Sequence, residues 1–383
     1  MNKRCFLPVD SVFFVRKSRC LSRETPQRDD FRLLALFLHK KMLECILPLY
    51  MRNLREKGRD DMGRMCFELP VEGASGYAIV ETELRVEPVL TGDILERLNP
   101  GDGFTIHKAG DLWWNVETGK NRGWILGRWC MVNLPDLVPS VIYDDTNAYC
   151  SVFRSSGRVI PGITGEKLYD AKSYNDRLEK EEFITPALLP LAAKLARAQA
   201  VALENGDCLK ICECYRPYSA QEKVVRCLTE LSKKDSQVMA GINTPPWELE
   251  WFIAPYISNH QLGYAVDLSL VKILEQTETV VKEQKVVKVE KYEEYEMQTP
   301  FHELSMASAT YKEPFPSMEP DWRKAEDSPT MTAGAKRLRS YCTQAGLTPL
   351  ASEWWHFNDL EAMEQTKENP GDGRYHCDKC YSR

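Results

Sequence analysis

The sequence lacks an uninterrupted apolar run long enough to cross a membrane. The apolar stretch at residues 31–51 is broken by His39, Lys40 and Lys41, whereas a membrane-spanning helix needs about 20 consecutive apolar residues. The stretch also begins late for a signal peptide, and no small-residue cleavage pattern follows it. We therefore expect no integral membrane span, and we interpret residues 31–51 as a packed or surface-lying helix.

An excess of positive charge is also missing. The chain has 50 Lys and Arg residues against 56 Asp and Glu residues, which gives a net charge of −6 and a pI near 5.7. Proteins that bind DNA or RNA need a basic face to displace counterions from phosphates. The composition therefore argues against a nucleic-acid partner.

A disulfide framework is the third absence. The chain has 13 cysteines, an odd number, and they are scattered without regular spacing. Disulfide frameworks are typical of short secreted domains, and this chain is far longer than those. The cysteines favour a reducing compartment, so we expect a cytoplasmic protein, with the cell envelope as the alternative.

The length and composition are sufficient for more than one domain. The chain has 383 residues, of which 43% are hydrophobic, and two domains are the default expectation at this size. We interpret residues 1–75 as an N-terminal extension. Met62 and Met65 stand just before the first domain-like sequence, so each is an alternative start.

Residues 76–139 have the pattern of a small all-β barrel. "GYAIVETELRVEP" alternates apolar and polar residues, "NPGDG" is a turn signal, and "FTIHKAGDLWWNVET" and "GKNRGWILGRWCMV" follow as further strands. This order of an arginine strand, a glycine turn, a paired-tryptophan strand and a closing "GW" strand resembles bacterial SH3-like domains. The resemblance implies binding to cell-wall peptide or peptidoglycan. The alternative is that the tryptophans at positions 113, 114, 124 and 129 only fill and flank the barrel.

Residues 140–366 have the pattern of an α+β domain. Residues 184–207 carry apolar residues at helical spacing and stop at Asn205-Gly206. "CLKICECYRPYSAQEKVVRCL" then predicts a strand, a turn at Arg216-Pro217 and a helix from about Ser219. Pro217 restricts Arg216 to extended backbone geometry, which suits a guanidinium that grips an anion.

Two short segments contain the residues of a possible metal site. In "ISNHQLGYAVDLSL", His260 precedes a glycine turn, and Asp267 and Ser269 share one face of the strand that follows. In "ASEWWHF", Glu353 and His356 flank two tryptophans. Two imidazoles, one ligating carboxylate and one spare carboxylate are the set that a catalytic zinc uses. Spacing alone also allows solvated or hydrogen-bonded side chains at each position.

Three motifs together resemble a known enzyme family. "CYRPYS" (214–219), "SNHQLGYAVDL" (258–268) and "SEWWHF" (352–357) occur in this order. They are similar to the motifs of the zinc D-alanyl-D-alanine dipeptidases known from vancomycin resistance and of the related D,D-carboxypeptidases. The resemblance spans most of the chain after Pro139. It implies an α+β zinc D,D-peptidase domain with a central antiparallel sheet, one Zn²⁺ per chain and a role in peptidoglycan metabolism.

The resemblance also assigns roles to individual residues. It implies that His260, Asp267 and His356 are the metal ligands, that Glu353 is the general base and acid, and that Arg216 steadies the scissile carbonyl. Zinc, a carboxylate base and a permanent cation are physically suited to these roles.

A second group of residues is expected to bind substrate. Ser258 and Tyr215 lie beside the predicted catalytic residues. Glu213 stands where close dipeptidases have aspartate, so its contact with the substrate amine is expected to differ.

Local geometry adds three further expectations. A regular strand at 353–356 would place Glu353 and His356 on opposite faces, so we expect a bend there, with Trp354 or Trp355 as a dry wall beneath the metal. The charged, Val-rich insertion at 271–297 predicts a β-hairpin that stands off the sheet, or a lid. Residues 367–383, which contain "HCDKC", are expected to be a flexible tail, with a metal site at Cys377 and Cys380 as the alternative.

Three functions remain open. The motifs favour a D,D-dipeptidase that cleaves free D-Ala-D-Ala. The SH3-like pattern favours a D,D-carboxypeptidase that trims peptidoglycan stem peptides, because a soluble dipeptide requires no wall anchor. The third is a wall-binding protein with an inactive catalytic domain, and the intact set of five site residues argues against it.

Overall fold

The structure is a computed structural model that describes residues 67–315 and 320–383. Residues Cys66–Arg383 form one compact unit. The helix expected at 31–51 lies outside the described residues. Among the residues described, no helix combines the length and the apolar character needed to cross a membrane.

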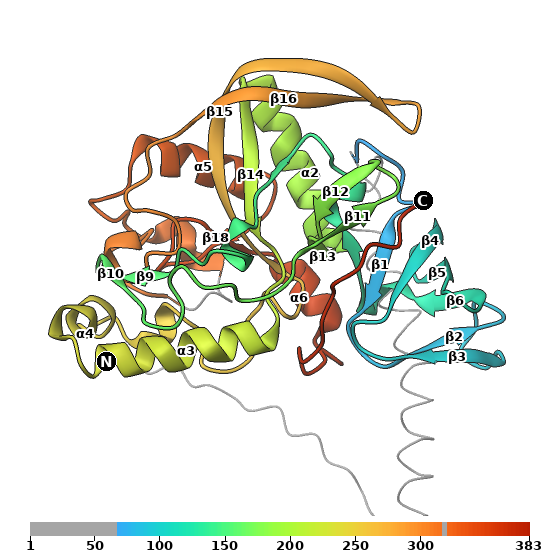
Figure 1. Ribbon diagram of the computed structural model, residues 1–383, viewed down its shortest axis with the longest axis horizontal. Coiled ribbons are helices and arrows are strands. Elements are labelled where there is room, and N and C mark those ends of the chain that lie inside the picture. Colours follow the sequence, from blue (N-terminus) through green and yellow to red (C-terminus); the bar gives the residue numbers. More distant parts are fainter. Residues whose placement is uncertain (1–66, 316–319) are drawn as a thin grey trace, which may run out of the picture. The chain divides into compact units, whose positions relative to one another are not determined.

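The described part of the chain is mixed α+β, with two large sheets (Figure 1). The N-terminal sheet has the strand order β13-β7-β1-β4-β5-β6-β2-β3. Its strands are β1 (Ser75–Ala78), β2 (Thr82–Arg85), β3 (Ile94–Leu98), β4 (Gly103–Ala109), β5 (Trp113–Glu117), β6 (Arg122–Leu126), β7 (Cys130–Asn133) and β13 (Pro186–Leu188). All of its pairings are antiparallel.

The second sheet, here called the central sheet, has the order β17-β18-β15-β14-β8, and β16 also pairs with β15. Its strands are β8 (Ile142–Tyr143), β14 (Asp207–Glu213), β15 (Ala265–Val281), β16 (Gln284–Glu294), β17 (Thr348–Pro349) and β18 (His356–Asn358). Only the β8–β14 pairing is parallel, so the prediction of an antiparallel central sheet is confirmed.

Helices and two small hairpins complete the described part. The helices are α2 (Leu189–Glu204), α3 (Tyr218–Ser232), α4 (Ser236–Ile242), α5 (Ala333–Gln344) and α6 (Leu360–Thr366). The hairpins are β9 (Arg154–Ser155) with β10 (Arg158–Val159), and β11 (Lys172–Asn175) with β12 (Lys180–Phe183). The predicted helix at 184–207 is therefore shorter at its start, because residues 186–188 form β13 instead.

The strand alternation predicted for residues 76–139 is present in the N-terminal sheet. Trp114 is 2% exposed and belongs to the hydrophobic core, while Trp113, Trp124 and Trp129 are half-buried. β13 lies beyond residue 139, yet it pairs with β7. One continuous hydrophobic core includes buried residues from both sides of residue 139.

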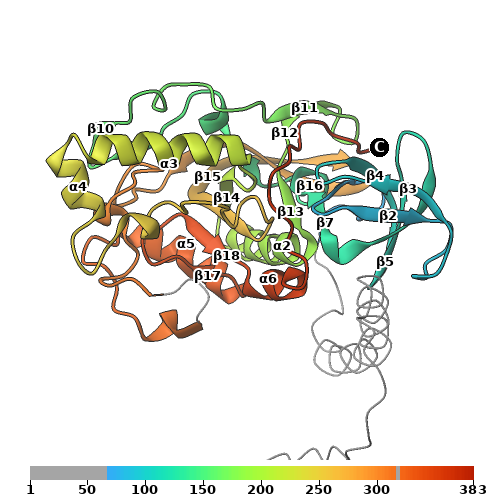
Figure 2. The same ribbon diagram turned by 90° about the horizontal axis from the view of Figure 1, so that it is seen from below.

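The two faces of the central sheet differ in polarity. Val266, Leu268 and Leu270 are fully buried members of the hydrophobic core, together with residues of α2 and α5. Asp267 and Ser269 alternate with them and therefore face the opposite side. Figure 2 shows α2 and α3 on opposite sides of β14 and β15. Alternation thus separates a packed hydrophobic face from a polar face.

The insertion at 271–297 forms the predicted hairpin. β15 continues past the central sheet and turns at Lys282 and Glu283, both with positive φ, into β16. In Figure 1 this long hairpin extends along the top of the molecule. Its tip lies about 50 Å along the strand from Asp267 at roughly 3.3 Å per residue, so the hairpin stands off the sheet and does not cover Asp267 as a lid.

The C-terminal segment at 371–383 is packed, and the expectation of a flexible tail is wrong. Tyr375 and Cys377 are only 5% and 6% exposed. The Tyr77 hydroxyl donates to the carbonyl of Lys379 (2.9 Å), and the amide of Tyr381 donates to Ser75 Oγ (2.8 Å). The segment has no helix or strand of its own, and distant parts of the chain supply its hydrogen-bond partners.

Deleting residues 371–383 should lower the free energy of unfolding by at least about 3 kcal/mol, because it removes the two buried apolar side chains of Tyr375 and Cys377 and exposes their neighbours. Urea denaturation measures this change. His376→Ala, an exposed position on the same segment, is the control and should change stability by less than about 0.5 kcal/mol. A deletion that leaves stability unchanged would show that the packing contributes nothing.

Candidate metal centre

Three neighbouring strands place acidic and imidazole side chains in one row. Asp267 of β15 is paired with Glu213 of β14 on one side and with His356 of β18 on the other. Paired residues on adjacent antiparallel strands present their side chains on the same face, about 5 Å apart. The register of the central sheet therefore brings together residues that lie far apart in the sequence.

A bulge in β14 is needed for this row. The register shifts between Ile211 and Glu213, so that Ile211 pairs with Leu268 and Glu213 pairs with Asp267. In a regular strand without the bulge, Cys212 would lie opposite Asp267 and strict alternation would turn Glu213 to the other face of the sheet. The bulge therefore aims Glu213 at the polar face.

His260 reaches the same point from the loop before β15. Gly263 in this loop has φ +77°, and a Cβ at this position would lie 2.6 Å from Met131 Sδ. Glycine is therefore required there both for its backbone conformation and for the close approach of β7. The tight turn returns the chain so that His260 lies next to Asp267.

The three predicted ligands converge on one point. His260 Nε2 lies 3.2 Å from His356 Nδ1 and 3.4 Å from Asp267 Oδ1, and His356 Nδ1 lies 2.9 Å from Asp267 Oδ1. Ligands at the zinc distance of 2.0–2.1 Å in a tetrahedral site are about 3.3 Å apart. The three atoms therefore have the mutual spacing of one coordination sphere.

Hydrogen bonds on the far side of each ring orient the two imidazoles. His260 Nδ1 lies 3.0 Å from the carbonyl oxygen of Cys214, which can only accept, so Nδ1 carries the proton. His356 Nε2 lies 3.1 Å from Asn358 Oδ1 and donates to it in the same way. In neutral rings the other two nitrogens then present lone pairs to each other and to Asp267. Partners of this kind fix the tautomer of metal-binding histidines.

The resulting donor set fits a divalent metal ion. Three electron-pair donors, all buried, face one another at contact distance. Such an arrangement is repulsive unless a cation or proton lies between the donors. Burial opposes ionisation of Asp267, yet the neighbouring His260 and His356 hold the pKa of its carboxyl well below its usual value.

A second buried group of possible metal ligands consists of Glu213, Asp267 and His302. The side chain of an arginine, Arg216, lies against this group. Arg216 Nε donates to Glu213 Oε2 (2.7 Å), and its Nη2 lies 3.6 Å from Asp267 Oδ2. The guanidinium already supplies the positive charge that a metal would bring. Among the described residues, neither of the two groups includes Cys377 or Cys380.

The predicted bend in "EWWH" is present. Residues 354–355 form a turn that leads into β18, and the amide of His356 approaches the carbonyl of Glu353 at 3.4 Å. The turn places Glu353 Oε2 3.9 Å from His356 Nδ1. Burial raises the pKa of Glu353 to about 8. Glu353 thus lies beside the three ligands as a spare carboxylate.

This raised pKa predicts a pH-dependent stability of the metal-free protein. The native state retains a proton on Glu353 between about pH 4.5 and 8, whereas the unfolded state has released it. The contribution of Glu353 to the free energy of unfolding therefore falls as the pH rises through this window, by up to about 1.4 kcal/mol per pH unit. Urea denaturation of chelated protein at pH 5 and pH 8 should show that Glu353→Gln loses less stability than the wild type. An equal loss in both proteins would contradict the prediction.

A cavity of about 210 Å³ opens onto the candidate ligands. Trp355 lines it and is fully buried, so this tryptophan forms the expected dry wall, while Trp354 lines a different cavity. Because water is excluded on this side, charges at the site interact more strongly. No residue of β16 lines the cavity.

The other predicted site residues divide into two groups. Arg216 and Ser258 line the cavity. Tyr215 and Glu213 do not, and this differs from the expectation that both contact substrate. The Tyr215 hydroxyl instead donates to the carbonyl of Tyr375, and the Glu213 carboxylate accepts hydrogen bonds from Arg216. Both side chains are committed to partners within the protein.

His302 is more important than the sequence indicates. The sequence predicts a residue either behind the metal ligands or on the surface, and the structure shows the first of these. It is 1% exposed, its Nε2 lies 3.0 Å from Asp267 Oδ2, and its ring stacks on Phe153 at 4.1 Å. It therefore holds the second oxygen of Asp267 and leaves Oδ1 free for the metal. Sequence spacing contains no signal for this contact.

His302→Ala should weaken zinc binding by about 10–100-fold, the usual effect of losing a group that orients a metal ligand. Competition with a chromophoric chelator measures the affinity. His107→Ala, which removes a histidine from β4 of the N-terminal sheet, should leave zinc affinity unchanged. Unchanged zinc affinity in His302→Ala would mean that Asp267 is oriented without it.

No protein-family model matches this sequence, and no curated protein matches it at a significant level. The resemblance of the three short motifs to those of zinc D,D-peptidases therefore stays a prediction.

Proposed function

We propose that this protein is a zinc-dependent D,D-dipeptidase that hydrolyses D-alanyl-D-alanine in peptidoglycan metabolism. The observation that carries the proposal is the convergence of His260, Asp267 and His356, with Glu353 beside them at 3.9 Å from His356 Nδ1. In this proposal residues 140–366 are the zinc D,D-peptidase domain and residues 76–139 are an SH3-like barrel. The cytoplasm is the proposed location.

The residues of the site can divide the work of hydrolysis. His260, Asp267 and His356 would hold the metal, and a bound Zn²⁺ would polarise the scissile carbonyl and lower the pKa of a water molecule to about 7. A divalent cation held beside Glu353 would favour the ionised form of its carboxyl, which would then accept a proton from the attacking water and return it to the leaving amine. Arg216 would steady the carbonyl oxygen as it becomes negative.

The size of the cavity supports a small substrate. Its volume of about 210 Å³ is below the range of roughly 300–1,000 Å³ that is typical of sites for drug-sized ligands. A dipeptide is compatible with such a volume, whereas a full stem peptide has to extend beyond it. The cavity therefore favours free D-Ala-D-Ala.

Two alternatives stay open. The resemblance of residues 76–139 to SH3-like domains favours a D,D-carboxypeptidase that removes the terminal D-Ala from stem peptides bound at the wall. A wall-binding protein with an inactive catalytic domain is the third reading, and the complete set of ligands and base argues against it.

Release of D-alanine from free D-Ala-D-Ala and from a muramyl pentapeptide, each with and without a metal chelator, tests the proposal. If D-alanine is released from the dipeptide but not from the pentapeptide, and the chelator stops this release, the result supports the dipeptidase. Release of D-alanine from the pentapeptide supports the carboxypeptidase. If neither substrate releases D-alanine in the presence of zinc, both enzyme functions are rejected.

A further inference from the structure

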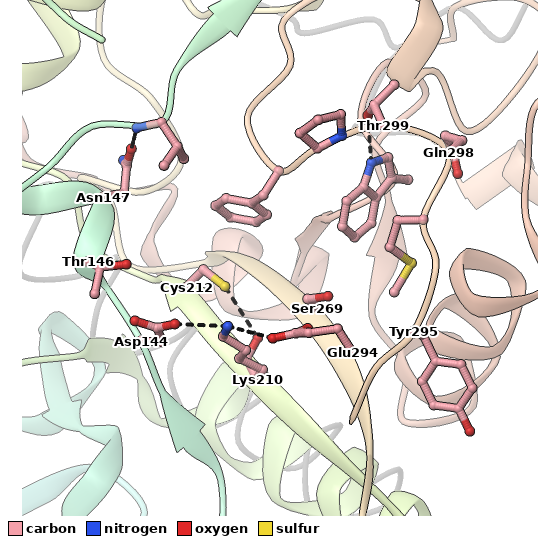
Figure 3. A pocket seen from close by; sticks show the side chains of 15 residues that line it. Asp144, Thr146, Asn147, Lys210, Cys212, Ser269, Glu294, Tyr295, Gln298 and Thr299 are labelled. Carbon is pink, nitrogen blue, oxygen red and sulfur yellow. Dashed lines mark hydrogen bonds and ion pairs between the residues drawn. The ribbon is translucent and has the colours of Figure 1, made fainter. Parts of the chain in front are cut away.

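A second and larger cavity lies on the polar face of the central sheet. It has a volume of about 560 Å³, and Figure 3 shows the side chains that line it. It shares no lining residue with the metal cavity. Lys210 and Ser269 form part of its floor, and these two residues pair across β14 and β15. Ser269 follows Asp267 by two positions on β15, so the cavity, here called the side groove, lies next to the metal centre. Its volume falls within the range of ligand-binding clefts.

The charged groups of the side groove are arranged asymmetrically. Lys210 Nζ lies 2.8 Å from Asp144 Oδ2 and 2.7 Å from Glu294 Oε1. The lysine side chain is 15% exposed, whereas the two carboxylates are 30% and 47% exposed. Two acids and one base leave a net charge of −1, and a ligand that enters the groove meets the carboxylates more readily than the ammonium group.

The polar atoms left over in the side groove are mainly hydrogen-bond acceptors. Each carboxylate uses one oxygen for Lys210, and its second oxygen has no hydrogen-bond partner among residues 67–315 and 320–383. Ser269 is only 8% exposed and lines the side groove. Figure 3 shows Ser269 beside Lys210 and Glu294. A hydroxyl in the lining and two free carboxylate oxygens suit a ligand with several hydrogen-bond donors.

The opposite wall of the side groove is apolar and aromatic. Phe301 and Trp354 line it together with Met297. The indole N–H of Trp354 donates to Thr299 Oγ1 (3.0 Å), as Figure 3 shows, so its only polar atom is already used. Aromatic faces bind both hydrocarbon and cations.

We propose that the side groove binds a small organic cation, an ammonium or guanidinium group carried on an apolar body. The cationic head would donate to Asp144, Glu294 and Ser269, and the apolar body would pack against Phe301 and Trp354. An anion is disfavoured, because Lys210 already donates to two carboxylates and is largely covered. The inference is independent of the peptidase function, since none of these residues lines the metal cavity.

Isothermal titration of the full-length protein with benzylamine, benzyl alcohol and benzoate tests the proposal, because the three probes share a ring and differ in charge. Benzylamine should bind at least about tenfold more tightly than benzyl alcohol, since charge-assisted hydrogen bonds are about twice as strong as neutral ones. Benzoate should bind most weakly. The same order is expected for zinc-loaded and metal-stripped protein, so a failure of the peptidase assay would not affect this result.

Substitutions of residues that line the side groove test whether benzylamine binds there. Glu294→Gln and Asp144→Asn should each weaken benzylamine binding about tenfold. Glu293→Gln, at the exposed neighbouring position outside the groove, should leave it unchanged, and thermal unfolding confirms that each variant is folded. Benzoate or benzyl alcohol binding as tightly as benzylamine would overturn the proposal. Benzylamine binding that is insensitive to both Glu294→Gln and Asp144→Asn would also overturn it.

Discussion

Replacing Glu353 by glutamine should lower the turnover of D-alanyl-D-alanine by about 10²–10⁴-fold, the usual contribution of a general base, while zinc stays bound. Glutamine keeps the shape of the side chain but cannot accept the proton of the attacking water. Glu353 Oε2 lies 3.9 Å from His356 Nδ1, so the carboxylate is beside the ligands without belonging to the set of three. Turnover assays and metal analysis of the same preparation measure the two effects separately.

The matched control is Glu248→Gln, an exposed carboxylate just before Leu249 that does not line the metal cavity. It should keep both zinc and turnover. Loss of zinc from Glu353→Gln would show that Glu353 is a ligand and that the roles are assigned wrongly. Full turnover in Glu353→Gln would mean that another group accepts the proton.

Replacing Asp267 by asparagine should remove zinc and abolish activity, and it should also destabilise the metal-free protein by about 3–5 kcal/mol, the usual cost of removing one partner of a buried ion pair. Asp267 is 1% exposed, and its two oxygens contact different partners. Oδ1 lies 2.9 Å from His356 Nδ1, and Oδ2 lies 3.0 Å from His302 Nε2 and 3.6 Å from Arg216 Nη2. A neutral amide cannot compensate the buried guanidinium or serve as an anionic metal ligand.

The control variant Asp136→Asn shows whether loss of stability alone is enough to prevent zinc binding. Asp136 is a fully buried carboxylate that accepts hydrogen bonds from the Ser75 amide (2.8 Å) and the Asn175 side chain (2.6 Å), away from the metal cavity. This variant should lose stability but still bind one zinc per chain. If Asp267→Asn retained zinc with unchanged affinity, the ligand set would have to be revised.

Much of the secondary structure can be predicted from local pattern. The alternation in β1–β7, the helix that ends before Gly206 and the hairpin of β15 and β16 all follow from periodicity and turn residues. The bend at 353–356 follows from a simple incompatibility, since an extended strand cannot place both Glu353 and His356 on one side. These features depend on residues that are close together in the sequence.

The packing of the tail and of the site's supporting residues could not be predicted in this way. The segment at 371–383 contains no periodic pattern, and its order depends on hydrogen bonds with Ser75, which accepts, and Tyr77, which donates, about 300 positions away. Tyr215 was expected to contact substrate because it adjoins Arg216, but its ring stacks on Tyr375 at 5.6 Å. Adjacency in the sequence does not determine which way a side chain points when the chain turns.

The sequence by itself determined which chemical groups are available: two histidines, an aspartate and a spare glutamate in short motifs with turns beside them. Only the tertiary structure decided that His260 and His356, 96 positions apart, meet at 3.2 Å. It also decided that His302 contacts Asp267, whereas Tyr215 hydrogen-bonds to Tyr375 and does not line the metal cavity. The physical reason is that local pattern specifies strands and turns, whereas strand register, the bulge at Cys212 and close packing at Gly263 set the distances between strands.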